Sequence, residues 1–121
     1  MIYSDIYKEF KEKIPEAVSF CREKEKQFML DDNDGMHVLF GFAVRPFVLK
    51  SLIEEDETAL EKIADFFEQM EADEDDEIGA VLEQSVLETL LAENRELITK
   101  NMKIWKSETR KAIEVVGQFI V

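Results

Sequence analysis

The sequence predicts an all-α protein, a compact bundle of six to seven short helices in a single domain spanning residues 1–121. Its longest apolar run, from Gly35 to Glu55, lies in a chain that is otherwise acidic, and other helices must cover most sides of such a run. Apolar residues recur at helical spacing along most of the remaining chain. A hydrophobic fraction of 45% and nine phenylalanines argue against disorder, although the formal net charge is −13.

Two helices are predicted within residues 1–34, where they would cap the rest of the bundle. The first covers Ile2–Lys13, whose apolar and charged residues fall on opposite sides. Pro15 begins the second, because proline at the first helical position loses no hydrogen bond. The residues expected to face inward on this second helix are Ala17, Val18, Cys21 and Phe28.

Pro46 is expected to divide the apolar run. We predict a helix over Met36–Phe42, a bend at Ala43–Arg45 and a new helix over Pro46–Glu54. Gly41 would let two helices approach closely. A phosphate-binding role is less favoured for it, because it stands alone, without the glycine-rich loop that a phosphate site needs. The residues expected to be buried on the second helix are Phe47, Leu49, Leu52 and Ile53.

The next predicted helix covers Glu57–Glu71, where Thr58 and Glu61 have the spacing of a capping box. The acidic run Glu71–Glu77 then separates it from a helix over Asp76–Ala92, whose N-terminus Asp75 and Asp76 would stabilise.

The C-terminal part is predicted to form two further helices. Asn94 would cap one that reaches Ile104 or Trp105, and Ser107 or Thr109 would cap the last. The inward residues of the last helix are expected to be Ala112, Ile113, Val116, Phe119 and Ile120.

The loop Asp31–Gly35 has a calcium-like composition. When Gly35 is aligned with the obligatory glycine of a calcium loop, Leu30 falls where the first carboxylate belongs and Gly41 where the closing glutamate belongs. A helix stop followed by a helix N-cap explains the loop better, and we predict no metal site there.

An internal repeat is visible at an offset of 38. Residues 48–55 and 86–93 share the pattern VLxxLφxE, where φ is aliphatic. A two-helix unit recurring at this distance predicts HEAT- or armadillo-like stacking of antiparallel helix pairs over residues 35–121. Chance similarity between two amphipathic helices is the alternative.

Composition narrows the location and the partners. The single cysteine, Cys21, cannot form an internal disulfide, and neither a signal peptide nor a run of eighteen apolar residues is present, so we expect a cytoplasmic protein without a membrane span. Twenty-eight acidic against fifteen basic residues would repel nucleic acid and attract a basic protein. Apolar residues left exposed after folding would instead indicate a homodimer.

The sequence gives little sign of catalysis, and we expect no enzymatic activity and no cofactor. The only histidine, His37, lies in the apolar run, and neither a zinc spacing nor a nucleophile elbow occurs. Pairs of carboxylates, such as Glu83 with Glu88 or Glu55 with Glu93, could meet across helices, but a solvated face explains them more simply.

A resemblance adds to this picture. The order of HVLFGFAVRPFVLKSLI, ALEKIADFFEQME, an acidic loop and VLEQSVLETLL resembles a small uncharacterised family of acidic, all-helical bacterial proteins, over about Met36 to Ala92. Members of that family resemble immunity proteins found beside polymorphic secreted toxins. The matching positions are packing residues, among them Phe40, Gly41, Pro46, Phe67, Met70, Val81, Leu82, Val86, Leu87 and Leu90.

The resemblance and the charge together lead to a first hypothesis, an immunity protein that neutralises a basic toxin domain by covering its active site with acidic residues. Trp105 and Phe66 are candidate aromatic anchors for that partner, and core packing is an equally good explanation of each. The alternative is a small helical ligand-binding protein or enzyme with a pocket near His37 and Arg45. The predicted partner-binding residues are Glu54, Glu55, Asp56, Glu57, Glu71, Asp73, Glu74, Asp75, Asp76 and Glu77.

Overall fold

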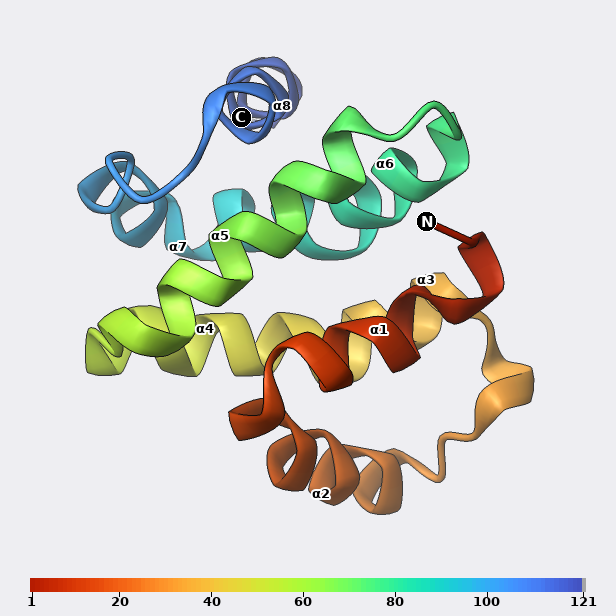
Figure 1. Cartoon of the computed structure of the whole chain (residues 1–121). Coiled ribbons are helices and arrows are strands. Elements are labelled where there is room, and N and C mark those ends of the chain that lie inside the picture. The colour runs from red at the N-terminus through yellow and green to blue at the C-terminus, as the bar shows by residue number, and fades with distance from the viewer. Residues whose placement is uncertain (121) are drawn as a thin grey trace.

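The computed structural model of the chain describes residues 1–120, and within them it confirms the all-α fold class (Figure 1). The described chain has eight α-segments, and two pairs of consecutive segments are each joined by a π-helical turn. The result is six continuous helices, which pack into a compact bundle. The α-segments are α1 (Ile6–Lys13), α2 (Val18–Phe28), α3 (Met36–Leu39), α4 (Arg45–Glu54), α5 (Glu57–Ala72), α6 (Asp76–Leu82), α7 (Glu88–Lys100) and α8 (Ser107–Phe119).

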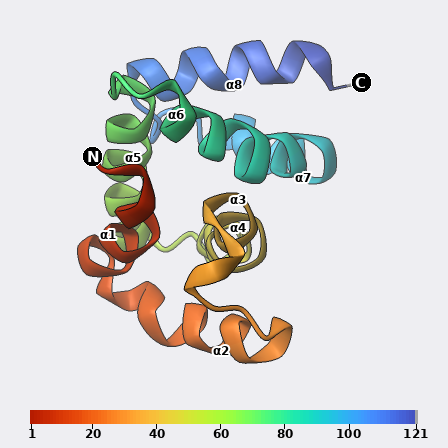
Figure 2. The ribbon, with the colours of Figure 1, turned by 90° about the vertical axis from the view of Figure 1, so that its right-hand side faces the viewer.

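Helix α5 crosses the middle of the bundle. In Figure 1 it runs diagonally between a lower group, α1 to α4, and an upper group, α6 to α8. Figure 2, turned by a quarter, shows α8 lying along the top of the molecule and α2 along the bottom. The core therefore continues from one group to the other through the buried side of α5, which contributes Leu60, Ile63, Phe66, Phe67 and Met70.

The apolar run forms one helix, Met36–Glu54, and the predicted bend at Ala43–Arg45 is wrong. A first π segment, Phe40–Val44, joins α3 to α4 without a break. In this wider turn the backbone N–H of Arg45 donates to the carbonyl of Phe40 instead of Gly41. The helix therefore absorbs Pro46 by widening its turn, not by ending before it.

Arg45 completes the backbone hydrogen bonding beside the proline. Its own N–H is directed to Phe40, and Pro46 has no N–H, so neither residue offers the Gly41 carbonyl a backbone donor. The side-chain Nε of Arg45 donates to that carbonyl at 3.1 Å instead. Half-buried Arg45 therefore has a structural role in the π segment.

This helix is 19 residues long and, by length and composition alone, it could cross a membrane. Half of its most apolar window is buried inside the domain, as in the core helix of a globular protein. Ile53, which we expected to be buried, is 62% exposed on its outer side.

The second long helix, Asp76–Lys100, repeats this construction. A second π segment, Glu83–Leu87, joins α6 to α7. Asn94 has non-helical backbone angles (φ −140°, ψ 41°) and marks a kink between two helical parts, next to the predicted boundary between Ala92 and Asn94. The helix ends at Lys100, before the predicted Ile104 or Trp105.

The two π segments define an internal repeat, and its offset differs from the one that the shared sequence pattern indicated. Phe40 and Glu83, their first residues, are 43 positions apart instead of 38. At this offset, buried positions coincide along both helices. The buried pairs are Met36 and Gly79, Leu39 and Leu82, Ala43 and Val86, Val44 and Leu87, Phe47 and Leu90, and Val48 and Leu91. Each long helix is followed by a single helix, α5 or α8, so the repeat is a pair of helices.

The N-terminal helix α1 belongs to the core. The ring of Phe10 makes edge-to-face contacts with Phe66 at 5.4 Å, Phe40 at 6.1 Å and Phe47 at 6.4 Å between centroids. Phe10 is fully buried, and it connects α1 to both α5 and the central helix. Residues 1–34 thus supply part of the hydrophobic core in addition to covering one side of the bundle.

Several predicted local features differ from the structure. Asp56, and not Thr58, caps α5 by accepting a hydrogen bond from the N–H of Ala59 at 3.2 Å. Phe28 and Phe119, expected to face inward, are 40% and 81% exposed. Two separate N-terminal helices are confirmed, since Pro15 begins a 3-10 turn that leads into α2.

The Asp31–Gly35 loop is a helix stop and cap, as predicted. Asp31 accepts a hydrogen bond from the N–H of Asn33 at 2.8 Å, and Asp34 accepts one from the N–H of Asp31 at 2.7 Å. Gly35 has a positive φ of 84°. The carboxylates thus serve the backbone of the turn that leads into α3.

Candidate functional site

The predicted acidic segments lie at opposite ends of α5 (Figure 1). Residues 54–57 form the α4–α5 turn, and residues 71–77 form the end of α5, the following turn and the start of α6. A helix of 16 residues is about 24 Å long, so the two segments are separated by roughly that distance. The structure does not bring them together into one cluster.

The acidic residues of the α4–α5 turn are exposed, and several have local partners. Lys50 pairs with Glu54 at 3.1 Å, and Lys100 pairs with Glu55 at 3.0 Å. Such exposed pairs contribute little to stability, about 0–1 kcal/mol each. Glu57 has no ion pair with any residue in the described part of the chain.

A cleft of about 550 Å³ opens beside this turn, between α5 and the α7–α8 connection. We call it the α5 cleft. Its apolar lining consists of Leu60, Ala64 and Ile104. The polar residues that line it are Glu55, Glu57, Glu61, Asp65, Asn101 and Lys106.

Four of these polar residues are acidic, and one is basic. Lys106 pairs with Asp65, and the hydrogen bond and charge of this carboxylate raise the pKa of the lysine. Glu57 and Glu61 are exposed and, within residues 1–120, free of ion pairs. A cleft with acidic residues around an apolar floor suits a basic side chain, whose hydrocarbon stem and charged end need both kinds of surface.

Glu61 and Asp65 were not among the predicted binding residues. They follow Glu57 at intervals of four residues, which places all three on one face of a helix. The signal was therefore present in the sequence. Contiguous acidic runs do not reveal it, because a helix groups residues that are four apart.

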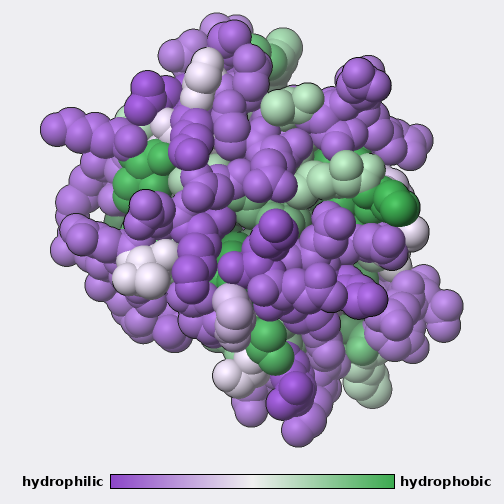
Figure 3. Space-filling model, viewed as in Figure 1, coloured by the Kyte–Doolittle hydropathy of each residue, from purple (hydrophilic) through white to green (hydrophobic). Residues whose placement is uncertain are grey.

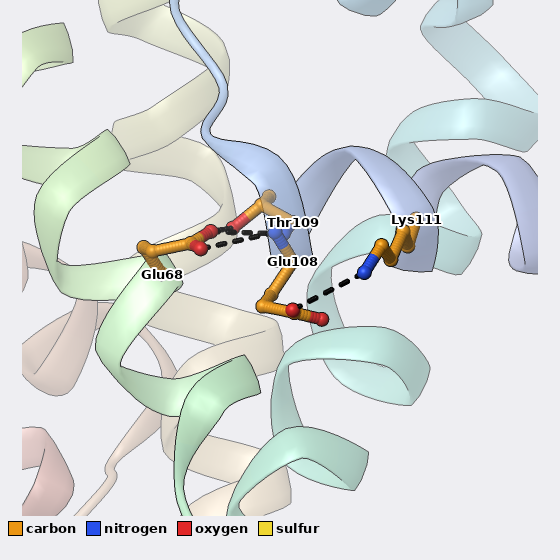
Figure 4. Close-up of polar contacts among 4 residues, drawn as sticks. All are labelled: Glu68, Glu108, Thr109 and Lys111. Carbon is orange, nitrogen blue, oxygen red and sulfur yellow. Dashed lines mark hydrogen bonds and ion pairs between the residues drawn. The ribbon is translucent and has the colours of Figure 1, made fainter.

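Glu68 continues this face but is used within the fold (Figure 4). Its carboxylate accepts hydrogen bonds from the N–H groups of Glu108 and Thr109, both at 3.0 Å, and from the Thr109 hydroxyl at 3.0 Å. Burial raises the pKa of Glu68, but these hydrogen bonds outweigh it and lower the pKa below its usual value. Glu68 thus caps α8, and the predicted caps Ser107 and Thr109 do not.

At the other end of α5, much of the acidic run also serves the fold. Asp73 accepts a hydrogen bond from the N–H of Asp75 at 2.9 Å and pairs with the amino group of Met1 at 2.9 Å. The hydrogen bond from Asp75 is the larger of these two causes that lower the pKa of Asp73. Asp75 caps α6, as predicted for the start of that helix. Glu74, Asp76 and Glu77 are left exposed.

The alternative pocket near His37 and Arg45 gains no support. His37 lies two helical turns before Arg45, and its Nδ1 is 2.7 Å from the hydroxyl of Ser85 on the second π segment. Arg45 binds the carbonyl of Gly41. Neither residue lines the cavities found in the described part of the chain.

The two candidate aromatic anchors are part of the core, so of the two explanations of Trp105 and Phe66 core packing is confirmed. Trp105 and Phe66 are each 1% exposed, and Trp105 stacks on Phe67 with a centroid distance of 6.0 Å. The face shown in Figure 3 is mostly hydrophilic, with small separate hydrophobic areas. A partner that meets this face would therefore contact charged groups first.

The fold and the site define a class: a small acidic helical domain whose clearest surface feature is an acid-lined cleft. Within residues 1–120, no group of three or more His, Cys, Asp or Glu residues is arranged to hold a metal ion. The chain belongs to the family described as "Domain of unknown function (DUF7674)", whose profile matches residues 7–119. No curated protein and no solved structure gives a significant match. The family description names no activity, so the immunity hypothesis stays a prediction.

Proposed function

We propose that this protein is a non-enzymatic binding protein, an immunity protein that neutralises a cognate toxin in the cytoplasm by covering the toxin's basic active site. The α5 cleft is the observation that carries the proposal, because beside its apolar floor it offers Glu57 and Glu61, which form no ion pair within residues 1–120. A lysine or arginine of the partner would enter this cleft. The exposed acids of the α5–α6 turn, Glu74, Asp76 and Glu77, would form a second contact.

The charge of the whole chain supports fast association. A formal net charge of −13 on 121 residues creates a field that attracts a basic domain over a distance of about one Debye length. Electrostatic attraction of this kind raises association rates by about 10- to 1000-fold and weakens steeply with salt. Fast capture suits a protein that must act before a toxin does.

A single partner can reach both acidic ends of α5. The two ends are separated by about 24 Å, the length of 16 helical residues. A standard interface buries about 800 Å² on each side, which corresponds to a patch about 30 Å across. The two contacts are therefore compatible with one interface, and they can be tested separately.

The experiment uses tagged protein and three variants that each remove a similar amount of charge. The cleft variant carries Glu57→Gln and Glu61→Gln, and the turn variant carries Glu74→Gln and Glu77→Gln. The control variant carries Glu12→Gln and Glu23→Gln, two exposed residues on α1 and α2 that do not line the α5 cleft. Each is incubated with lysate of the native cell at low salt, and bound proteins are identified by mass spectrometry. The captured partner is then purified for affinity and activity assays.

We expect wild-type protein and the control variant to capture the same basic enzyme and to inhibit its activity at equimolar ratio. The cleft variant should bind at least about tenfold more weakly, which corresponds to the loss of about 1.4 kcal/mol. Its affinity should also depend less on salt. The proposal is wrong if the cleft and turn variants bind and inhibit like the control, or if the bound protein keeps its activity.

A further inference from the structure

A pair of carboxyl groups meets at the end of α5, outside the α5 cleft. Glu71 lies in the last turn of α5 and Glu83 begins the second π segment, while Gly79 lies between them on α6. A Cβ atom placed on Gly79 would be 3.4 Å from Oε2 of Glu83 and 3.6 Å from Oε2 of Glu71. Both carboxyl groups therefore lie on the same side of α6, over Gly79. The pairs that the sequence suggested were Glu83 with Glu88 and Glu55 with Glu93.

No cation neutralises this pair among the described residues. Oε2 of Glu71 is fully buried and has no hydrogen-bond donor, and neither glutamate forms an ion pair. The Met1 amino group is bound to Asp73 instead. The charged groups that face the pair from the surrounding elements are acidic: Glu68 on α5, Glu108 on α8, and Asp73, Asp75 and Asp76 around a hollow of about 300 Å³.

Two carboxylates in such contact cannot both carry a charge at low cost, because like charges repel strongly where water is excluded. If one group is protonated, its O–H can donate to the other, and the buried Oε2 of Glu71 gains a partner. We propose that Glu71 and Glu83 share one proton and thereby form a pH-sensitive latch that keeps the α5–α6 turn closed. Loss of the proton releases the turn from the second π segment.

The pKa of Glu71 agrees with this geometry. Burial raises it well above the usual value, and the hydrogen bond that protonated Glu71 can make with Glu83 and the charges of Glu83, Glu68 and Glu108 raise it further. Because the pKa is raised in the folded state, the closed turn is most stable below the ordinary glutamate pKa of about 4.3, and stability is lost as the pH rises through the raised value. Glu68 and Asp73 have lowered pKa values, so their protonation changes stability in acid and not in the range in which Glu71 loses its proton.

The test measures local opening of the turn as a function of pH. Hydrogen exchange of peptides that cover residues 71–82 is followed from about pH 5 to about pH 9 and corrected for the intrinsic exchange rate. The proteins are wild type, Glu71→Gln, Glu83→Gln and the control Glu74→Gln, which changes an exposed residue of the same turn. Glutamine keeps the size of the side chain and mimics the neutral acid. A peptide from α2 reports on global unfolding.

We expect the opening equilibrium of the turn in wild-type protein to rise by up to about tenfold per pH unit in this range, because opening releases one proton. The Glu71→Gln and Glu83→Gln variants should lose this dependence, and Glu74→Gln should keep it. The latch is disproved if wild-type protection of residues 71–82 is independent of pH, if the variants keep the wild-type dependence, or if the α2 peptide changes in parallel. The experiment needs no partner, so its result is independent of the proposed toxin binding.

Discussion

The carboxylate of Glu68 on α5 accepts hydrogen bonds from both the backbone N–H and the hydroxyl of Thr109 on α8, each at 3.0 Å (Figure 4). The first turn of a helix leaves N–H groups without partners, and a side chain of the same helix usually serves them. Here the acceptor comes from a residue 41 positions earlier in the chain. The cap therefore also fixes how α8 packs on α5.

Replacing Glu68 with glutamine should destabilise the protein by about 1–2 kcal/mol, because the amide is a weaker acceptor than the carboxylate and leaves a helix N-terminus without its negative charge. Urea unfolding followed by the fluorescence of Trp105, the single tryptophan, measures this difference. Glu61→Gln, an exposed change on the same helix, should alter the unfolding free energy by less than about 0.5 kcal/mol. Equal effects of the two changes would show that the cap contributes nothing.

The same contact predicts a pH dependence in acid. Because the pKa of Glu68 is lowered in the folded state, its stabilisation is present above the ordinary pKa of about 4.3 and is lost as the pH falls through the lower, folded value. The loss of thermal stability between about pH 4.5 and pH 2.5 should be smaller in Glu68→Gln than in wild-type protein. Thermal melts by circular dichroism over this range measure it, and parallel curves would contradict the role of Glu68.

Much of the fold could be predicted because it follows from local patterns. Apolar spacing gave the all-α class, the two N-terminal helices and the extent of α5. The predicted bend before Pro46 is wrong because the rule that proline ends a helix assumes an α-helical turn. Here the π segment and the side chain of Arg45 together supply donors to the carbonyls of Phe40 and Gly41. The cap by Glu68 and the pair of Glu71 and Glu83 each join residues that are distant in the sequence, and no local pattern reveals such contacts.

The site could be predicted only in part for the same reason. Glu55 and Glu57, two of the predicted binding residues, line the α5 cleft, but its other wall comes from Asn101, Ile104 and Lys106 after the second long helix. In the sequence, Trp105 and Phe66 fit both an anchor and a core residue, because a large side chain gives no indication there of whether it is buried. A single sequence shows the charge of a surface much more readily than its shape.

Phe10 should be among the most costly positions to truncate. Phe10→Ala removes a fully buried ring that touches three other phenylalanine rings, so we expect a loss of about 3–5 kcal/mol. Phe119→Ala provides the control, because that ring is 81% exposed and should change stability by less than about 0.5 kcal/mol. Denaturant unfolding compares them. A small effect at Phe10 would mean that α1 only covers the bundle.

Two glycines should respond oppositely to alanine. Gly41 lies in the first π segment, and a Cβ there would meet the Ser85 carbonyl oxygen at 3.7 Å, an ordinary contact, so Gly41→Ala should be neutral or stabilise by up to about 1 kcal/mol. Gly35 has a φ of 84° and a ψ of 162°, which other residues rarely adopt, so Gly35→Ala should cost about 1–3 kcal/mol. Unfolding midpoints of both variants test this. A destabilised Gly41→Ala would restore the expectation that Gly41 is needed for close packing of the helices.

Cys21 should not react while the protein is folded. Its side chain is fully buried in α2, and burial is the largest cause that raises the pKa of the thiol to about 11. Only the thiolate reacts with a disulfide reagent, so both access and ionisation are suppressed near pH 8. We expect modification by an aromatic disulfide to be at least about 100-fold slower in native than in urea-unfolded protein, since it must await unfolding. Glu68→Gln, which lowers stability at a distance from α2, should speed the reaction in proportion to its larger unfolded fraction. Rapid labelling of the native wild-type protein would show that α2 opens locally and exposes Cys21 in solution.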